Sequence, residues 1–261
     1  MKIKNFADSE KNLRESMRIF ESFRQDIYSS YSDLEKVLKY DQNALVYRNL
    51  QELLVEKGRF KEGLEMSERG RARAFVELLV RQSIAKPTDP IDFQPPSIDL
   101  IQRIAKIQKA TLVEYSIIAE ELKIKDKVQI VDSKLFIWVV SPSGEVSFRP
   151  VNLLSKGKPL RDFVTSSRIS IGARGRGSSI VLDSIDSVEK ADQLKQLHEL
   201  MIRPIYDLLP TNSEDRIIFV PQGILSLVPF PALQDTTGKY LIEKHTILTV
   251  PAIQVLDLTH Q

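Results

Sequence analysis

The chain contains no cysteine, and this absence excludes more functions than any other feature of the sequence. Without a thiol the chain cannot form a disulfide, supply a thiolate metal ligand or act through a cysteine nucleophile. Histidine is nearly as scarce. His198, His245 and His260 are far apart and lack the paired spacing of zinc ligands. We therefore expect no metal site and no bound cofactor.

Long apolar runs are also missing. The longest strongly apolar run, Leu135–Val140, is far shorter than the ~20 residues that cross a bilayer. Residues Met1–Phe6 carry charge but no apolar stretch of signal-peptide length. We therefore expect a protein without membrane contact, and the cytoplasm is the predicted compartment.

The chain lacks a strong excess of either charge. Its formal net charge is +2, with 17 basic and 15 acidic residues up to Pro90 and 20 of each beyond it. A surface that neutralises phosphates needs a clear positive excess, so nucleic-acid binding is not favoured. A hydrophobic content of 42% is nevertheless enough for a real core. The length of 261 residues allows two domains, or one domain with a helical extension.

Helices are predicted for most of the first 85 residues. Leu13, Met17 and Phe20 recur at helical spacing between charged residues. Two further helices are expected at about 41–57 and 60–82, and Gly58 provides the stop between them. Two antiparallel helices joined by such a turn form a helical hairpin.

This hairpin resembles a tetratricopeptide repeat (TPR). The resemblance is carried by Tyr47, Leu50, Leu54, Gly58, Phe60, Gly63, Leu64 and Gly70. In this family small residues on the second helix let it approach the first closely. Gly63 and Gly70 stand where the family usually has alanine, and each weakens the helix by up to ~1 kcal/mol. Ser9, Leu13 and Ser16 fit the second helix of a preceding repeat. Because about three repeats are needed for a stable stack, the pattern resembles the end of a longer array.

A proline-rich linker is predicted over residues 86–97. Four prolines lie between Pro87 and Pro96, where they end the helix. An amphipathic helix is expected next, at about 98–109, with Ser97 or Asp99 near its N-cap.

An α/β pattern begins at residue 111. β-branched and aromatic runs at 111–118 and 134–140 predict strands. After the turn Ser141–Gly144, residues 145–151 are expected to return as an antiparallel hairpin partner. The lysine-rich segment 120–132 is predicted to be a solvated extension of the first hairpin.

Helices are predicted again at about 153–167 and 187–209, with a flexible loop at Ile171–Ser179 between them. Residues 216–220 are typical of a short buried strand. Strand character returns at 240–250, and an apolar helix begins at residue 252.

Several of these segments resemble the CHAT domain, a relative of caspases often placed after TPR arrays. The matching segments are Ser67–Phe75, Leu112–Tyr115 with the strand of Trp138, Ile202–Ile205 with Leu208–Pro210, Phe219–Leu233, Tyr240–Glu243 and Val250–Ala252. The most specific of them is Phe219–Leu233. The resemblance implies a mixed α+β or α/β fold. It divides the chain into a TPR-like α-helical hairpin at 1–85, a linker at 86–97, and an incomplete caspase-like α/β domain with an antiparallel hairpin subdomain at 98–261.

The resemblance assigns no catalytic residue to this chain. Catalytic members use a histidine followed by glycine and, further on, a cysteine, both beyond the matched segments. The sequence ends at Gln261, before either would be reached. We therefore expect no catalytic, cofactor-binding or metal-binding residue, and an inactive, truncated form.

Each histidine has a plain structural interpretation. His245 is not followed by glycine and has no thiol to activate, so it is predicted to be a strand-edge histidine. His198 lies beside Glu199 on a predicted helix, and His260 lies near the end of the sequence.

Serine and arginine offer two further candidate sites. Ser226, with Ser184 and Asp183, could indicate a serine hydrolase, but the nucleophile-elbow pattern is absent. Arg174 and Arg176 could hold a phosphate or an RNA backbone, although a solvated loop is the plainer interpretation. The helical arginines are expected to pair with nearby glutamates. The arginines are Arg69, Arg71 and Arg73, and the glutamates are Glu65, Glu68 and Glu77.

The sequence therefore predicts a protein-interaction module that binds a protein partner through its TPR-like helices. The resemblance implies that the parent protein uses this array to regulate a caspase-like peptidase. The alternative is a part of such a peptidase, completed by a missing segment that supplies histidine and cysteine. A parallel sheet of very few strands would leave its edges open, so self-association or a missing partner segment is also expected.

Overall fold

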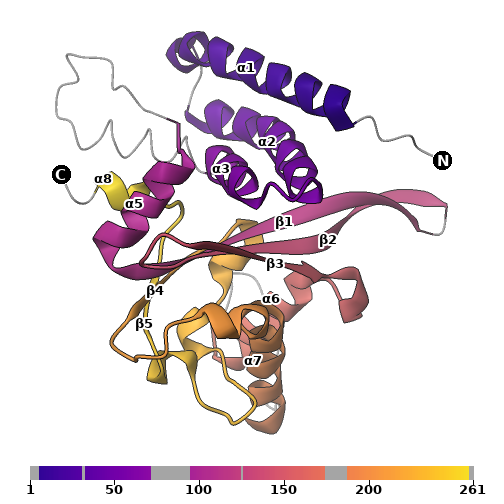
Figure 1. The fold of residues 1–261 in the computed structure, drawn as a ribbon. Helices are drawn as coiled ribbons and strands as arrows, with labels where there is room; N and C mark the ends of the chain where they lie inside the picture. The colour runs from indigo at the N-terminus through magenta and orange to yellow at the C-terminus, as the bar shows by residue number, and fades with distance from the viewer. Residues whose placement is uncertain (1–5, 31–32, 72–94, 125, 174–186, 259–261) are drawn as a thin grey trace. The chain divides into compact units, whose positions relative to one another are not determined.

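The computed structural model describes residues 6–30, 33–71, 95–124, 126–173 and 187–258 (Figure 1). The chain divides into two compact units. One comprises Met1–Ile104 together with Ala252–Gln261, and the other comprises Ala105–Pro251. We call them the helical unit and the sheet unit and describe each by itself.

The helical unit contains α1 (Phe6–Ser30), α2 (Asp33–Glu56) and α3 (Phe60–Gly70). A tight turn joins α2 to α3. Gly58 has a φ of 74°, a left-handed conformation that glycine adopts without steric cost. The Arg59 N–H donates to the Leu54 carbonyl at 2.9 Å, which closes the turn. The predicted helical hairpin is confirmed.

The core of this unit lies between the three helices. Its buried members are Met17, Tyr47, Leu50, Leu53, Leu54 and Met66. Leu50 and Leu54 lie one turn apart on α2 and are fully buried, as the leucine spacing of that helix predicts. Complete burial of such a side chain stabilises the fold by roughly 1.5–3 kcal/mol.

Two helix boundaries differ from the prediction. α2 begins at Asp33 rather than at residue 41, because the intervening residues include good helix formers such as Glu35 and Lys36. α3 is described only as far as Gly70, so the predicted continuation at 72–82 and linker residues 86–94 lie outside the described residues. The domain boundaries at 85 and 98 stay predictions.

Helix α5 (Ile98–Gln108) confirms the amphipathic helix expected after the prolines. Its N-cap is Ser97, whose hydroxyl oxygen accepts the Leu100 N–H at 3.2 Å. Ile101 and Ile104 are fully buried, whereas Ile107 is half exposed.

The sheet unit is built on one five-stranded sheet in the order β3-β2-β1-β4-β5. The strands are β1 (Ala110–Ile124), β2 (Lys127–Val140), β3 (Val146–Asn152), β4 (Arg216–Val220) and β5 (Thr246–Thr249). The three strands β1, β2 and β3 are antiparallel neighbours, and β1-β4 and β4-β5 are parallel pairs. The mixed helix-and-sheet fold is confirmed. The antiparallel hairpin continues into the parallel part of the sheet, because β1 pairs with both β2 and β4.

The β1–β2 hairpin is longer than its apolar runs. Pairing continues past an irregularity at Ile118/Ala119 to Ile124 opposite Lys127, so the predicted extension of the first hairpin is confirmed. Val128 and Ile130 on this extension are largely exposed.

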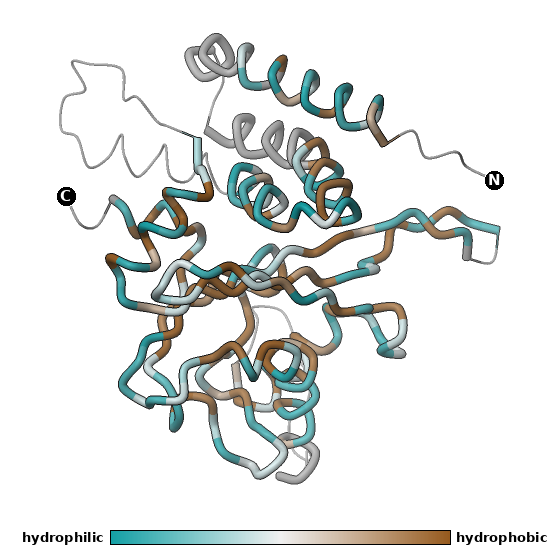
Figure 2. Tube along the Cα trace, in the orientation of Figure 1, coloured by the Kyte–Doolittle hydropathy of each residue, from teal (hydrophilic) through white to brown (hydrophobic). Residues whose placement is uncertain are grey.

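The core of the sheet unit lies on the face of the sheet covered by α6 (Leu160–Ser170) and α7 (Ser187–Met201) (Figure 1). Alternate residues of the strands supply it, as the two-residue period of a strand requires. They include Val113 and Tyr115 on β1 and Leu135, Ile137 and Val139 on β2. Figure 2 shows hydrophobic positions concentrated along these strands.

Prolines and glycine shorten both predicted helices of this unit. α6 starts at Leu160 rather than 153, because Gly157 has a left-handed φ of 76° and Pro159 precedes the first turn. α7 ends at Met201 rather than 209, because Pro204 cannot continue an α-helix. Residues Arg203–Leu208 form a 3₁₀-helix instead.

The C-terminal strand prediction was too long. Of residues 240–250, only Thr246–Thr249 form a strand, and Leu241–Glu243 form a short 3₁₀-helix. The helix predicted from residue 252 is the single turn α8 (Val255–Leu258). Among the described residues, no helix has the length and apolar character needed to cross a membrane.

Candidate functional site

Gly70 on α3 lies close against Tyr47 on α2. A Cβ atom added to Gly70 would lie 2.9 Å from the Tyr47 Cβ, closer than real Cβ contacts. Tyr47 is buried there, and its hydroxyl donates to the Glu21 carboxylate on α1 at 3.2 Å. The small residue predicted to let the second helix approach the first has this role at position 70.

An ion-pair cluster links α1, α3 and the α2–α3 turn at the other end of the hairpin. Glu10 on α1 accepts from Lys57 at 2.7 Å and from Arg59 at 2.8 Å and 2.9 Å. Arg59 also donates to Glu62 on α3, and Arg14 bridges Glu10 and Glu62. Hydrogen bonds from Lys57, Arg14 and Arg59 lower the pKa of Glu10 to about 2. The bond from Arg59 likewise holds the pKa of Glu62 below its ordinary value.

The outer face of α2 is the candidate protein-binding surface. Leu45, Asn49, Glu52 and Glu56 lie four, three and four positions apart, which places them on one side of the helix, away from the buried Leu50 and Leu54. Leu45 is 52% exposed, Asn49 and Glu56 are exposed, and Glu52 is half-buried. We call these four residues the α2 face. They offer one apolar anchor beside an amide and two carboxylates.

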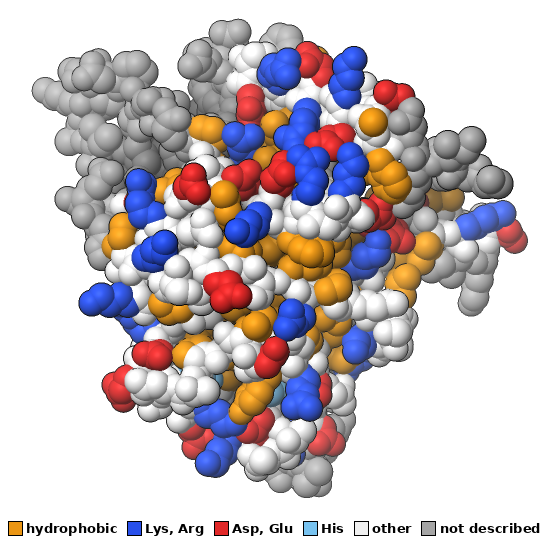
Figure 3. Space-filling view, viewed as in Figure 1, with side chains coloured by type: hydrophobic (Ala, Val, Ile, Leu, Met, Phe, Trp, Pro, Cys, Tyr) orange, Lys and Arg blue, Asp and Glu red, His pale blue; other side chains and the backbone are white. Residues whose placement is uncertain are grey.

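Charge on the visible side of the molecule is mixed. Figure 3 shows Lys and Arg side chains interspersed with Asp and Glu side chains over the helices, without a large area of one sign. This distribution fits the balanced charge of the sequence and does not resemble a phosphate-binding stripe.

Helix α3 uses two glutamates to hold backbone groups from distant segments. The Glu65 carboxylate accepts the Ile98 N–H at 2.6 Å, and the Glu68 carboxylate accepts the Gln254 N–H at 2.9 Å. Glu68 is buried. The sequence interpretation assigned these glutamates to nearby arginines and missed their backbone partners, because nothing in the local pattern points to segments 33 and 186 residues away.

Two histidines are buried in the sheet unit. His198 on α7 is 4% exposed and His245, just before β5, is 7% exposed. Burial lowers the pKa of both imidazoles, so both are neutral at pH 7. Within the described part of the chain, the Nδ1 atom of each is buried without a hydrogen-bond partner. Ser226 is exposed on the 3₁₀-helix Gly223–Leu227.

His198 lines a cavity of about 440 Å³, and the carboxylate of Asp235 in that cavity is already engaged. Asp235 on its wall accepts from the Thr237 hydroxyl at 2.6 Å, from the Lys239 N–H at 3.0 Å and from the Lys244 ammonium at 2.5 Å. Although burial raises the pKa of Asp235, the bonds from Lys244 and Thr237 bring it below its ordinary value. The carboxylate therefore organises the turn that carries it and is not poised as a base.

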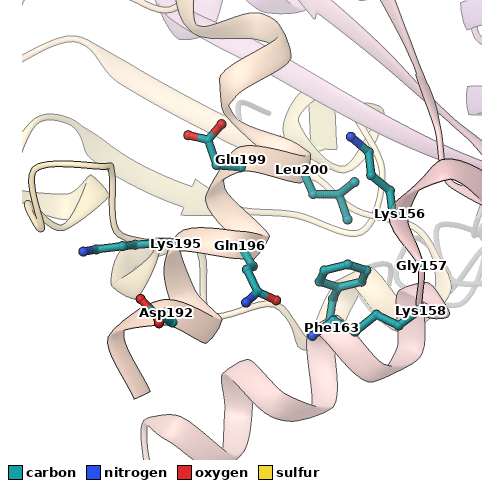
Figure 4. Close-up of a pocket in the computed structure, with 9 residues that line it drawn as sticks. All are labelled: Lys156, Gly157, Lys158, Phe163, Asp192, Lys195, Gln196, Glu199 and Leu200. Atoms are coloured by element: carbon teal, nitrogen blue, oxygen red, sulfur yellow. The ribbon is translucent and has the colours of Figure 1, made fainter. Parts of the chain in front are cut away.

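A second cavity, of about 700 Å³, lies between α6, α7 and the loop before α6 (Figure 4). Its lining mixes three lysines with Asp192 and Glu199. In Figure 4 the side chains of Lys156 and Lys195 extend in different directions and do not converge. Lys158 lies 4.2 Å from the centroid of the Phe163 ring and donates to Gln193 at 3.3 Å. The described residues contain no group of three or more histidine or acidic side chains placed to hold a metal ion.

Several predicted candidates lie outside the described residues. They are Arg73, Arg174, Arg176, Asp183, Ser184 and His260. Their interpretations stay predictions.

Comparisons with known proteins find similarity to one domain family and to two longer proteins. The CHAT domain family model matches residues 191–261. Over 349 aligned residues the chain is 23% identical to tetratricopeptide repeat protein 28 of Homo sapiens, covering 97% of this chain and 13% of that protein. The Mus musculus protein of the same name is 22% identical over 347 residues, covering 97% of this chain and 14% of the relative. The chain thus spans about a seventh of the length of these relatives.

Proposed function

We propose, from the TPR–CHAT resemblance that these comparisons support, that the chain is a regulatory, protein-binding part of a TPR–CHAT protein, without a catalytic dyad of its own. The observation that carries this proposal is the α2–α3 hairpin, packed at Gly70 and Tyr47 as a TPR hairpin is expected to pack. The lack of cysteine supports the second half of the proposal, because a caspase-like reaction needs a thiol nucleophile.

The α2 face supplies the chemistry of binding. Leu45 is an exposed apolar anchor, and Glu52 and Glu56 follow it along the same side of the helix. Such a surface suits a partner segment that presents an apolar side chain next to lysine or arginine. TPR hairpins stack into arrays whose concave surfaces bind proteins.

A second candidate function is a part of a caspase-like cysteine peptidase completed by another segment. The edge strand β5 favours it. β5 pairs with β4, and the described residues place no strand on its other side. Leu248 on β5 is 46% exposed, which leaves an apolar position at an open edge. The completing segment would have to supply both the histidine and the cysteine.

Affinity capture with surface variants tests the first function. The full chain is used as bait beside the double variant Leu45→Arg, Asn49→Arg and the control Val128→Arg, which changes an exposed residue on the β1–β2 hairpin. We expect a partner that is retained by the wild type and the control and lost with the double variant. Equal recovery by all three baits would refute binding through the α2 face.

Peptidase assays separate the two functions. The chain alone is expected to cleave no fluorogenic peptide. Activity that appears only after mixing with a polypeptide carrying the C-terminal half of a CHAT domain would favour the second function.

A further inference from the structure

We propose that α3 is a clamp that holds, within the helical unit, both the start of α5, which leads into β1, and the segment that follows β5, so that a shift of α3 moves both segments together. This inference rests on the proposed regulatory function and names the element that carries the signal. Its two contact points are the hydrogen bonds that the carboxylates of Glu65 and Glu68 accept from backbone N–H groups.

The first contact point is the entry to the sheet unit. The Ile98 N–H is the first of α5, and it donates to Glu65 at 2.6 Å. The first N–H groups of a helix have no partner within that helix, and a carboxylate there also interacts favourably with the helix dipole. α5 leads directly into β1, because only Lys109 separates them. Glu65 therefore fixes the start of the helix that carries the chain into the sheet.

The second contact point is the exit. After β5 the chain is still attached to the sheet at Val250, whose N–H donates to the Phe219 carbonyl at 3.0 Å. It then passes into the helical unit at Ala252. Ala252, Ile253 and Gln254 are all buried, and the Gln254 N–H donates to Glu68. The segment that follows the sheet is thus held by α3.

The two contact points move together because they are on one rigid element. Glu65 and Glu68 are three residues apart on α3, so they lie on neighbouring turns of the same side of the helix. A translation or rotation of α3 displaces both acceptors at once. In the direction of α2, the position of α3 is fixed by the contact of Gly70 with Tyr47. α2 carries the proposed partner-binding face, so a partner bound there acts on the helix against which α3 packs.

Two carboxylates could also be simple helix caps, with effects confined to stability. The two accounts differ in what happens when α3 is shifted without touching either glutamate. Gly70→Ala provides that shift, because its new Cβ would collide with the Tyr47 Cβ and push the helices apart. Gly58→Ala is the matched control. It strains the turn at a φ of 74°, but its Cβ meets no atom within 4 Å.

Amide hydrogen exchange of the full chain tests the clamp without any partner. In Glu68→Leu, which removes the acceptor, the amides of Gln254–Leu256 are expected to exchange about tenfold faster, as loss of one buried bond to a carboxylate implies. The centre of β4 at Ile217 should be unaffected. In Gly70→Ala exchange is expected to rise together at Ile98–Ile101 and Gln254–Leu256, and in Gly58→Ala at neither.

Two results would overturn the clamp. One is unchanged exchange at Gln254–Leu256 in Glu68→Leu. The other is a uniform increase over all amides in Gly70→Ala, which would indicate general destabilisation. Neither result bears on whether a partner binds the α2 face, so the clamp and the proposed function can fail separately.

Discussion

Gly70 and Tyr47 approach so closely that the glycine leaves no room for a side chain: its Cβ would lie 2.9 Å from the Cβ of the tyrosine. This contact joins the two helices of the hairpin and sets the separation between the α2 face and the clamp on α3. The sequence contains the reason for it, a glycine where the TPR family usually has alanine.

Gly70→Ala is therefore expected to destabilise the protein, although alanine is the better helix former. Overpacking costs ~1–3 kcal/mol, which outweighs a propensity gain of up to ~1 kcal/mol. The measurement is the urea midpoint of unfolding at constant m-value. Lys61→Ala, at an exposed position of α3, should shift the free energy of unfolding by less than about 0.5 kcal/mol. A stabilised Gly70→Ala variant would show that the helices are not in tight contact.

The ion-pair cluster around Glu10 predicts a loss of stability in acid. The pKa of Glu10 is about 2 in the folded state and near 4.5 without its partners, so the unfolded chain binds the proton more tightly. The stabilisation is complete above pH ~4.5 and is lost as the pH falls toward 2.

The variant Glu10→Gln isolates this contribution. It should lower the free energy of unfolding at pH 7 by about 1 kcal/mol and have a smaller effect at pH 2. Glu15→Gln is the control, because its pair with Arg18 is exposed to solvent on both sides. Equal losses at both pH values would mean that the charge of Glu10 is not involved.

The sheet core predicts a second pH dependence, at the alkaline end. Tyr115 is fully buried, its hydroxyl donates to the Met201 carbonyl at 3.1 Å, and burial raises its pKa well above 10. The unfolded chain therefore loses this proton more readily, and the stabilisation present below pH ~10 declines as the pH rises further. Tyr115→Phe should cost about 1 kcal/mol at pH 7 and remove this part of the alkaline decline. Ultraviolet titration that finds Tyr115 ionising near pH 10 in the folded protein would contradict the prediction.

The open edge of β5 predicts self-association of the isolated chain. A second copy can pair with the side of β5 that no other described strand occupies and cover Leu248, as edge strands commonly permit. Sedimentation velocity should show a mass that rises with concentration. Leu248→Lys should reduce this association, whereas Val128→Lys, at another exposed apolar position, should not. A monomer at all concentrations would count against an open edge.

Local pattern predicted much of this fold. The leucine spacing of α2 and the stop at Gly58 predict the hairpin, and the runs around Leu112 and Trp138 predict the central strands. These features depend on residues close in sequence, for which periodicity and turn chemistry are informative. The position of Pro204 was also enough to predict the end of α7, because the effect of a proline on a helix is local.

The rest depends on contacts between distant segments. Glu68 and Gln254 are 186 residues apart, and neither residue type indicates that a backbone N–H is its partner. The same holds for Gln222, whose side-chain oxygen accepts the Ile117 N–H at 2.7 Å where β1 continues beyond the end of β4. Sequence reasoning assigned Glu68 to nearby arginines because short-range ion pairs are the interactions that helical spacing favours.

The most direct test of the regulatory account is hydrogen exchange of the full chain with and without a captured partner. The account predicts slower exchange over residues 45–56 of α2, together with a change at Gln254–Leu256. Protection confined to β5, with residues 45–56 unchanged, would contradict it and favour completion of the sheet by a missing segment.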